Sequence, residues 1–219
     1  MTGENKLKTH WMIAGGLVVF CFVSAAIAFP YLPERIPIHF NMEGKPDGWG
    51  GRATIFIMPA MVGFMVGLMA GIPWLSPKGF SIDDHHRVYG ALLLILTGLF
   101  CFIHVCILLG TFWEKMPTRI LIAGLLAFLA LLGNQLGRVE RNFFVGVRTP
   151  WTIASERVWI ETHRLAAWLS VAACGLGLLL LAIPAVPAWA PFIVAMAGLV
   201  YPALHSLILY KRLEARGEL

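Results

Sequence analysis

Long apolar runs that carry almost no charge alternate with short polar segments along the chain. A helix needs about 20 apolar residues to cross a hydrocarbon core of roughly 30 Å. Because lipid offers no hydrogen-bond partners to the backbone, such runs are expected to be helical. The pattern therefore predicts an all-α polytopic membrane protein, a bundle of six transmembrane helices. The six runs lie approximately at 11–29, 53–75, 88–112, 120–133, 165–183 and 189–210.

These runs take up most of the chain, so we expect a single integral membrane domain over residues 1–219. Its N-terminal part, 1–87, contains a long polar loop, and its C-terminal part, 88–219, contains the densest polar segment. The fourth run is short for a full span, and we expect it to continue through 134–137 to reach the interface. A hydrophobic content of 58% and a mean hydropathy of +0.76 agree with lipid as the surroundings.

The distribution of Lys and Arg predicts the orientation in the membrane. If the N-terminus is cytoplasmic, the alternating loops place 12 of the 17 basic residues on the cytoplasmic side and five on the other. Because cytoplasmic loops carry the excess of positive charge, we expect both termini in the cytoplasm. The net charge of +5 then reflects loops beside anionic lipid. We expect a phospholipid bilayer as a partner and no direct contact with nucleic acid.

One polar segment, residues 133–164, separates the fourth run from the fifth. It holds five of the 17 Lys and Arg residues and three of the 12 Asp and Glu residues. Asn134, Arg138 and Asn142 recur every fourth residue, a spacing that places side chains on one face of a helix. We therefore expect the fourth span to extend as a helix into the headgroup region.

A second helix is predicted inside the polar segment. Gly146 favours a turn that other residues resist. Thr149 is a good N-cap, and the proline after it is a favoured first helical residue. Trp151 and Trp159 suit the membrane interface, where one end of the ring meets water. We therefore expect an interfacial helix near 150–163.

Two interpretations of the polar segment remain open from the residues alone. The first is a re-entry helix that Trp and Arg anchor on lipid headgroups. The second is a hydrogen-bonded pocket or partner-binding surface at the cytoplasmic mouth of the bundle. The residues expected to form this surface are Asn134, Arg138, Asn142, Arg148, Thr149, Trp151, Ser155, Trp159, Thr162, His163 and Arg164.

The loop between the first two runs lies on the outside in this orientation. Apolar residues alternate with others over 36–40, which predicts a short strand, and the apolar content suggests that the loop folds back as a cap. His39 and Asp47 suggest a metal or acid–base site, but two ligands are fewer than a metal site needs. The alternative is that His39 and Asn41 cap turns. We expect His39, Asn41, Asp47 and Trp49 to contact an external ligand.

No nucleophile elbow, HExxH motif or phosphate-binding loop occurs in the sequence. We therefore assign no catalytic residue, metal ligand or cofactor, and we favour a protein that is not an enzyme. The alternative is a membrane-embedded enzyme or carrier that acts on a lipid or peptide through the polar site at 134–164. Glu156, Glu161 or His163 would then supply its acid–base groups.

Few polar groups lie within the apolar runs themselves. His104 lies deep in the third run, where an ionisable residue is a functional candidate by default. Because no acidic or basic residue lies mid-span to relay a proton, we favour a neutral histidine hydrogen-bonded between helices. The four cysteines also lie within the runs, and we expect them to pack as small apolar residues.

The polar segment and the outside loop together resemble a known family. The ordered motifs GN-x-x-G, RN, GVRTPWT and S-x-x-VW-x-x-THR resemble the signature of the SdpI family of bacterial immunity proteins. The outside motifs LPERIPIHFN and GKPDGWG resemble the domain of unknown function that is commonly joined to it. The resemblance implies a multi-pass protein of the bacterial inner membrane. It also implies tolerance to a secreted peptide toxin and signalling to a cytoplasmic repressor, which the family's named member holds at the membrane.

Overall fold

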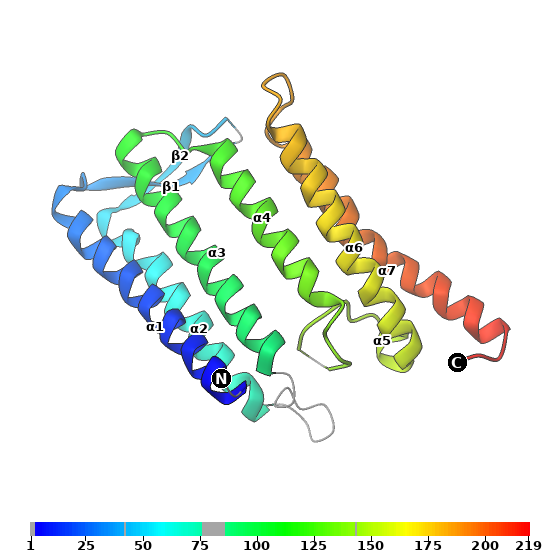
Figure 1. The fold of residues 1–219 in the computed structure, drawn as a ribbon. Helices are drawn as coiled ribbons and strands as arrows, with labels where there is room; N and C mark the ends of the chain where they lie inside the picture. Colours follow the sequence, from blue (N-terminus) through cyan, green and yellow to red (C-terminus); the bar gives the residue numbers. More distant parts are fainter. Residues whose placement is uncertain (1–2, 42, 76–85, 143) are drawn as a thin grey trace. The chain divides into compact units, whose positions relative to one another are not determined.

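The computed structural model describes residues 3–41, 43–75, 86–142 and 144–219. Helices make up most of the described chain, and one two-stranded sheet follows the first helix (Figure 1). The elements are α1 (Gly3–Ala28), η1 (Phe29–Tyr31), β1 (Arg35–Phe40), β2 (Pro46–Gly51), η2 (Arg52–Phe56), α2 (Ile57–Leu75), α3 (His86–Trp113), α4 (Thr118–Leu136), α5 (Pro150–Ala154), α6 (Glu156–Leu181) and α7 (Ala190–Ala215).

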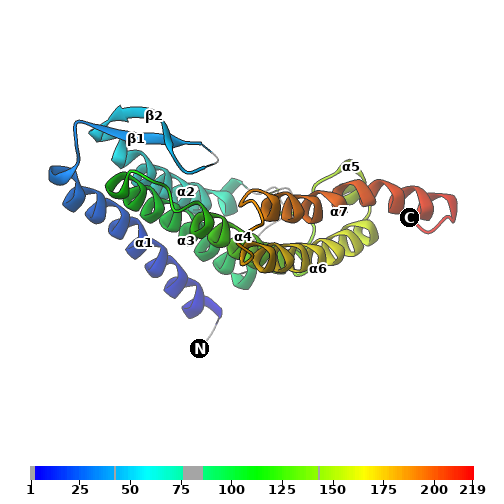
Figure 2. The ribbon, with the colours of Figure 1, turned by 90° about the horizontal axis from the view of Figure 1, so that it is seen from above.

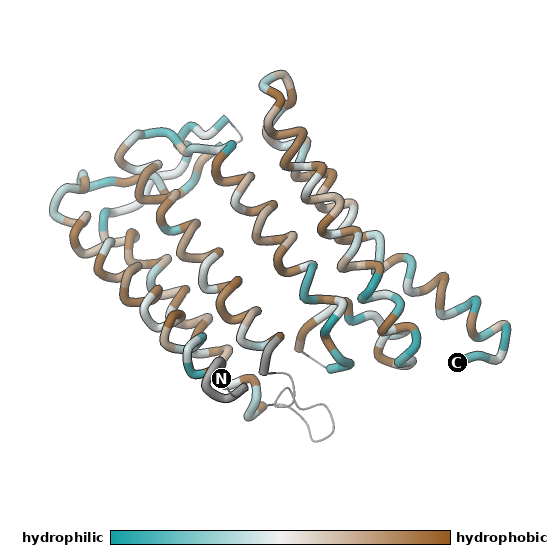
Figure 3. The backbone as a smooth tube through the Cα atoms, viewed as in Figure 1, coloured by the Kyte–Doolittle hydropathy of each residue, from teal (hydrophilic) through white to brown (hydrophobic). Residues whose placement is uncertain are grey.

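Six of these helices are long and apolar enough to cross a membrane. Figure 3 shows hydrophobic residues along the helices and hydrophilic residues in the sheet and between α4 and α5. The prediction of an all-α polytopic membrane protein with six spans is therefore confirmed. The candidate spans are Leu7–Tyr31, Arg52–Leu75, Val88–Trp113, Thr118–Leu136, Glu156–Leu181 and Ala190–Ala215.

The chain forms two compact units, and each is described by itself. The first unit contains α1, the sheet, and most of α2 and α3. Ile36 of β1 is 1% exposed and packs in one core with Ala25, Leu32 and Ile55. Burial of an Ile side chain contributes about 1.5–3 kcal/mol, which fixes β1 on the helices. The predictions of a strand and of a loop that folds back are confirmed.

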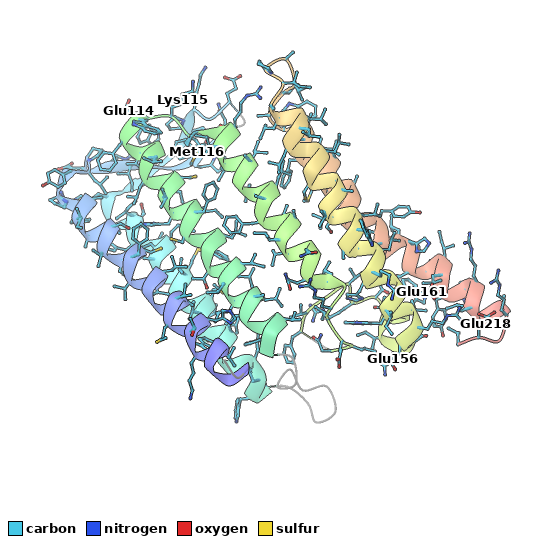
Figure 4. The ribbon with its side chains drawn as sticks, viewed as in Figure 1. Glu114, Lys115, Met116, Glu156, Glu161 and Glu218 are labelled. Atoms are coloured by element: carbon cyan, nitrogen blue, oxygen red, sulfur yellow. The ribbon has the colours of Figure 1, made fainter. Side chains whose placement is uncertain are left out.

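The strands β1 and β2 pair antiparallel, and we call them with their turn the hairpin. The Asn41 side chain accepts hydrogen bonds from the amides of Glu43 at 2.9 Å and Lys45 at 3.0 Å, as predicted for a turn cap. Gly44 has a φ of 78°, a left-handed conformation that Gly adopts without strain. Its carbonyl accepts a 2.9 Å hydrogen bond from the amide of Met116 in the turn after α3 (Figure 4). The loops after the first and third spans therefore lie on the same side.

His104 links α3 to α1 inside the first unit. It is fully buried, and its Nε2 lies 3.0 Å from the Ser24 hydroxyl. That hydroxyl donates to the carbonyl of Cys21 at 3.1 Å, so the histidine is the group that donates to Ser24. This agrees with the neutral histidine hydrogen-bonded between helices that the sequence suggested, although the buried Nδ1 of His104 has no hydrogen-bond partner among the described residues.

The second unit contains α5, α6, α7 and the C-terminal half of α4. Figure 2 shows α6 and α7 lying side by side. A Cβ atom at Gly198 of α7 would lie 2.5 Å from the Cβ of Ala173, and one at Gly133 of α4 would overlap Ser170 of α6. Small residues let helices approach closely in lipid. Glycine at these two positions therefore sets the spacing of α6 from both neighbours.

Two predictions about the polar segment differ from the structure. The predicted helical face of Asn134, Arg138 and Asn142 is wrong, because α4 ends at Leu136 and only Asn134 is helical. The amide of Arg138 bonds to the carbonyl three residues earlier, a turn that closes the helix. The helix expected near 150–163 is present in two pieces, because Ser155 is extended and caps a new helix, α6.

The close approach at Gly133 generates a first prediction. Gly133→Ala should lower the thermal unfolding midpoint in detergent, because an overpacked contact typically costs about 1–3 kcal/mol. Gly175→Ala is the matched control, since a Cβ there meets nothing within 4 Å. Equal midpoints for the two variants would contradict the close contact between α4 and α6.

Candidate functional site

The start of α5 is held by two threonines. Thr149 is the N-cap, and its hydroxyl accepts from the amide of Thr152 at 3.2 Å. The Thr152 hydroxyl accepts from the amide of Thr149 at 2.9 Å and lies 2.8 Å from the carbonyl of Val147. The Thr149 hydroxyl also lies 3.0 Å from Ser206 of α7. The predicted N-cap is confirmed, and it ties the helix start to α7.

The loop before α5 is shaped by the buried side chain of Asn142. Its Oδ1 accepts from the amides of Phe144 and Val145, each at 2.7 Å. Its Nδ2 lies 2.8 Å from the carbonyl of Glu140 and 3.1 Å from that of Val145. A buried amide with all of these partners replaces the hydrogen bonds that the helix would have made. Asn142 therefore shapes the loop from inside.

Trp159 and His163 form the buried centre of the segment. The two rings stack at 4.0 Å between centroids and are 1% and 2% exposed. The Trp159 indole N–H donates to the carbonyl of Val139 at 2.8 Å. His163 Nδ1 lies 2.8 Å from the carbonyl of Trp159, and His163 Nε2 accepts from the amide of Val147 at 2.9 Å. These partners assign a neutral imidazole with its proton on Nδ1.

Gly146 lies directly against this ring pair. Its φ of 123° lies in a region that L side chains rarely adopt. A Cβ atom there would overlap His163 Nε2 and lie 3.2 Å from Trp159. The predicted turn is confirmed, and the structure adds a second requirement for glycine at this position.

The remaining predicted residues lie around this centre. Ser155 caps α6 through a long 3.5 Å bond from the amide of Val158. Thr162 is fully buried, and its hydroxyl has no hydrogen-bond partner among the described residues. Asn134 and Arg148 are exposed, and Trp151 is half-buried. The structure therefore divides the predicted set into a buried scaffold and an exposed rim.

An open pocket of about 340 Å³ lies beside the stacked rings. It brings together four predicted residues: Arg138, Trp159, His163 and Arg164. Its full lining is Gly137, Arg138, Val139, Glu140, Arg141, Glu156, Trp159, Ile160, His163 and Arg164. The pocket therefore combines a charged rim with an apolar floor.

Other residues of the segment lie away from the pocket. Glu161 and Glu218 come from α6 and the chain's C-terminal end (Figure 4). Arg157 pairs with both, at 3.1 Å and 2.7 Å. Such exposed pairs contribute little stability, because water and salt screen them. They connect the start of α6 to the C-terminal end of the chain.

Sequence reasoning missed several contributors. Arg141 was visible in the RN motif, and its Nη1 donates to the carbonyl of Ile153 at 3.2 Å. Thr152 follows the N-cap by three residues, a spacing that predicts a capping partner. Ser206 is a single hydroxyl in an apolar helix, and Val139 acts through its carbonyl, so neither carries a recognisable signal.

The hairpin carries the other predicted site. His39 Nδ1 hydrogen-bonds to Asp47, so His39 pairs with an acid instead of capping a turn. Asn41 is used by the turn, and Trp49 is 47% exposed on β2. Among the described residues, no group of three or more His, Cys, Asp or Glu side chains could hold a metal ion. The His39–Asp47 pair thus lacks a third ligand within the described chain.

A second pocket, of about 400 Å³, lies beneath β1. Ile36, Ile38 and Phe40 of the strand face it together with Ile103 and Ile107 of α3. The rest of the lining is Pro37, His39, Asn41, Thr54, Ile55, Ile57, Met58, Met116, Thr118 and Leu121. Most of these side chains are apolar, so the pocket suits an apolar group.

Known proteins match the chain at both sites. A model of the SdpI/YfhL protein family matches residues 138–210, and a model of a domain of unknown function, DUF1648, matches residues 16–63. Immunity protein SdpI of Bacillus subtilis (strain 168) is 28% identical over 164 residues, which are 73% of this chain and 74% of that protein. The chain is therefore similar to the SdpI family, over residues 138–210 and along most of the relative's length. Its family region begins at Arg138 on the pocket rim, and the DUF1648 region contains the hairpin. No solved structure matches the chain significantly.

Gly146 generates the second prediction. Gly146→Ala should lower the free energy of unfolding by more than about 2 kcal/mol. The backbone is strained for Ala, and the new methyl group overlaps the His163 ring. We expect a lower thermal unfolding midpoint and faster proteolytic cleavage within residues 138–148. The matched control is Gly137→Ala, whose Cβ would meet Ala167 at an ordinary 3.4 Å. Proteolysis at the wild-type rate in Gly146→Ala would contradict the assigned packing.

Proposed function

We propose that the protein is a non-enzymatic immunity and receptor protein of the bacterial inner membrane. It confers tolerance to a secreted peptide toxin that it meets on the outside, and it signals to a cytoplasmic regulator. Both termini lie in the cytoplasm, in agreement with the excess of Lys and Arg on that side. The similarity to Immunity protein SdpI over 73% of the chain supports the proposal.

The observation that carries the proposal is the hairpin, which is fixed on the helices and has an apolar pocket beneath it. Ile36 anchors the strand in the core, and the Met116 amide fixes the turn through Gly44. Trp49 remains exposed on the opposite strand. Peptides that act on membranes carry apolar side chains beside charges, and this surface offers an apolar pocket beside the His39–Asp47 pair. A fixed surface also loses little conformational entropy on binding.

The polar segment suits the second part of the proposal. Its buried side chains hold one another and the backbone, so the loop is a shaped surface and not a free linker. Arg148 is exposed at its outer edge, and Trp151 is half-buried at the start of α5. Arg and Trp are enriched where partners bind. We assign these two side chains to the cytoplasmic docking surface.

The outside site is tested by expressing the gene in a sensitive bacterium and measuring growth against a panel of secreted peptide toxins. Expression should raise the inhibitory concentration of one toxin several-fold. Trp49→Ala should remove most of this gain, because an exposed aromatic anchor is lost. Trp189→Ala is the matched control, since Trp189 is 46% exposed and precedes α7.

Two outcomes would contradict the tolerance proposal. Unchanged growth with and without the gene over the whole panel would reject it. Loss of tolerance in Glu156→Gln and Glu161→Gln, with wild-type tolerance in Trp49→Ala, would instead favour the enzyme or carrier that uses the polar segment. Immunoblots of the membrane fraction exclude a difference in protein level.

Signalling is tested separately by transcription of the gene and its neighbours after toxin exposure. Arg148→Ala and Trp151→Ala should abolish the toxin-dependent change and leave the amount of protein in the membrane unaltered. Arg212→Ala removes an exposed arginine near the end of α7 and serves as the control. Full induction in both polar-segment variants would reject this docking surface.

A further inference from the structure

We propose that the pocket at the start of α6 binds the headgroup phosphate of an anionic phospholipid. The inference concerns the bilayer itself and does not depend on the proposed toxin or regulator. It rests on the charges around the pocket, on its apolar floor and on the exposed apolar face of α6 that adjoins its rim.

Three arginines from two parts of the chain converge on this pocket. Arg138 and Arg141 follow the end of α4, whereas Arg164 lies in the third turn of α6. Arg141 is oriented by its bond to the carbonyl of Ile153. Arg138 and Arg164 are exposed, and no described residue forms an ion pair with either. The planar guanidinium group presents paired donors that match two phosphate oxygens.

The charge of the lining matches a single phosphodiester. Glu140 and Glu156 also line the pocket, and the hydrogen bonds of His163 assign it a neutral ring. The lining contains three arginines and two glutamates, so its net charge is +1. A phosphodiester whose headgroup carries no amine, as in phosphatidylglycerol, supplies one negative charge. A zwitterionic headgroup would leave the pocket's charge uncompensated.

The rim of the pocket adjoins an exposed apolar face of α6. Ile160, Arg164 and Trp168 recur every fourth residue on α6 and share one face. Ile160 is 48% exposed and Trp168 is 74% exposed, as expected for apolar side chains of a span that contact lipid. Arg164 and Ile160 line the pocket, so its rim continues into this face. A bound phospholipid would extend its acyl chains along the face past Trp168.

The floor of the pocket suits the remainder of a headgroup. Trp159 is 1% exposed and Val139 is 9% exposed, and the indole N–H of Trp159 is already bonded to the backbone. These buried side chains form the base of the pocket, and the arginines of its rim would surround the phosphate of a lipid. The α6 span begins at Glu156, so the pocket lies at the end of an apolar helix, where headgroups lie.

The test uses the full chain, purified in detergent and analysed by native mass spectrometry with added lipid. Phosphatidylglycerol, phosphatidylethanolamine and phosphatidylcholine of matched acyl chains are titrated separately. We expect one phosphatidylglycerol to bind roughly tenfold more tightly than the other two lipids, because all three present the phosphate but only the other two carry an ammonium group, which the arginines repel. Equal binding of all three lipids would overturn the inference.

Variants identify the site. Arg138→Gln and Arg164→Gln should each weaken phosphatidylglycerol binding roughly tenfold, and Arg164→Lys should retain part of the affinity. Arg157→Gln removes the same charge from α6 outside the pocket and should bind as the wild type does. An equal loss in Arg157→Gln would show a general charge effect and overturn the site.

Two further measurements distinguish a lipid in the pocket from a misfolded variant and from a soluble anion. Thermal unfolding midpoints of the apo variants confirm that they fold, and Arg138→Gln should be unaffected because Arg138 is exposed and has no ion pair among the described residues. Millimolar inorganic phosphate should not displace the lipid. Displacement by phosphate would assign the pocket to a soluble anion and overturn its assignment to the bilayer.

Discussion

The need to satisfy backbone hydrogen bonds where the chain leaves a membrane helix governs both polar regions. After α4 ends at Leu136, the backbone loses its helical partners beside an apolar environment. The Asn142 side chain accepts hydrogen bonds from two backbone amides, and His163 accepts one from the amide of Val147. The Trp159 indole supplies a donor to Val139. These bonds fix the shape of the segment and thereby the position of the arginines around its pocket.

The turn of the hairpin also uses a side chain to accept hydrogen bonds from backbone amides. Asn41 accepts two amides of its turn with one side-chain oxygen, as Asn142 does in the other unit. Gly44 and Gly146 each adopt a positive φ next to these asparagines. Each polar region therefore combines one asparagine whose side chain accepts backbone amides with one glycine that permits the reversal. The result is a β-hairpin in one unit and a charged pocket in the other.

The sequence predicts a structural feature correctly where one physical effect determines it. The six spans follow from hydropathy alone, and Thr149 with its proline predicts the start of α5 because capping is local. The helical face through Arg138 failed because periodicity ignores competition from the Asn142 side chain. The break at Ser155 was not predicted, because residues 150–163 read as one continuous helix from their sequence pattern. Contacts through a carbonyl, such as that of Val139, have no residue-type signal at all.

Helix α4 connects the two polar regions directly along the chain. It begins at Thr118, two residues after the amide that holds the hairpin turn, and ends one residue before the pocket lining starts. Its 19 residues form a rod of about 28 Å, longer than a typical soluble helix and stiff on that scale. A single helix therefore carries the chain from the turn that holds the hairpin to the first residue of the pocket lining.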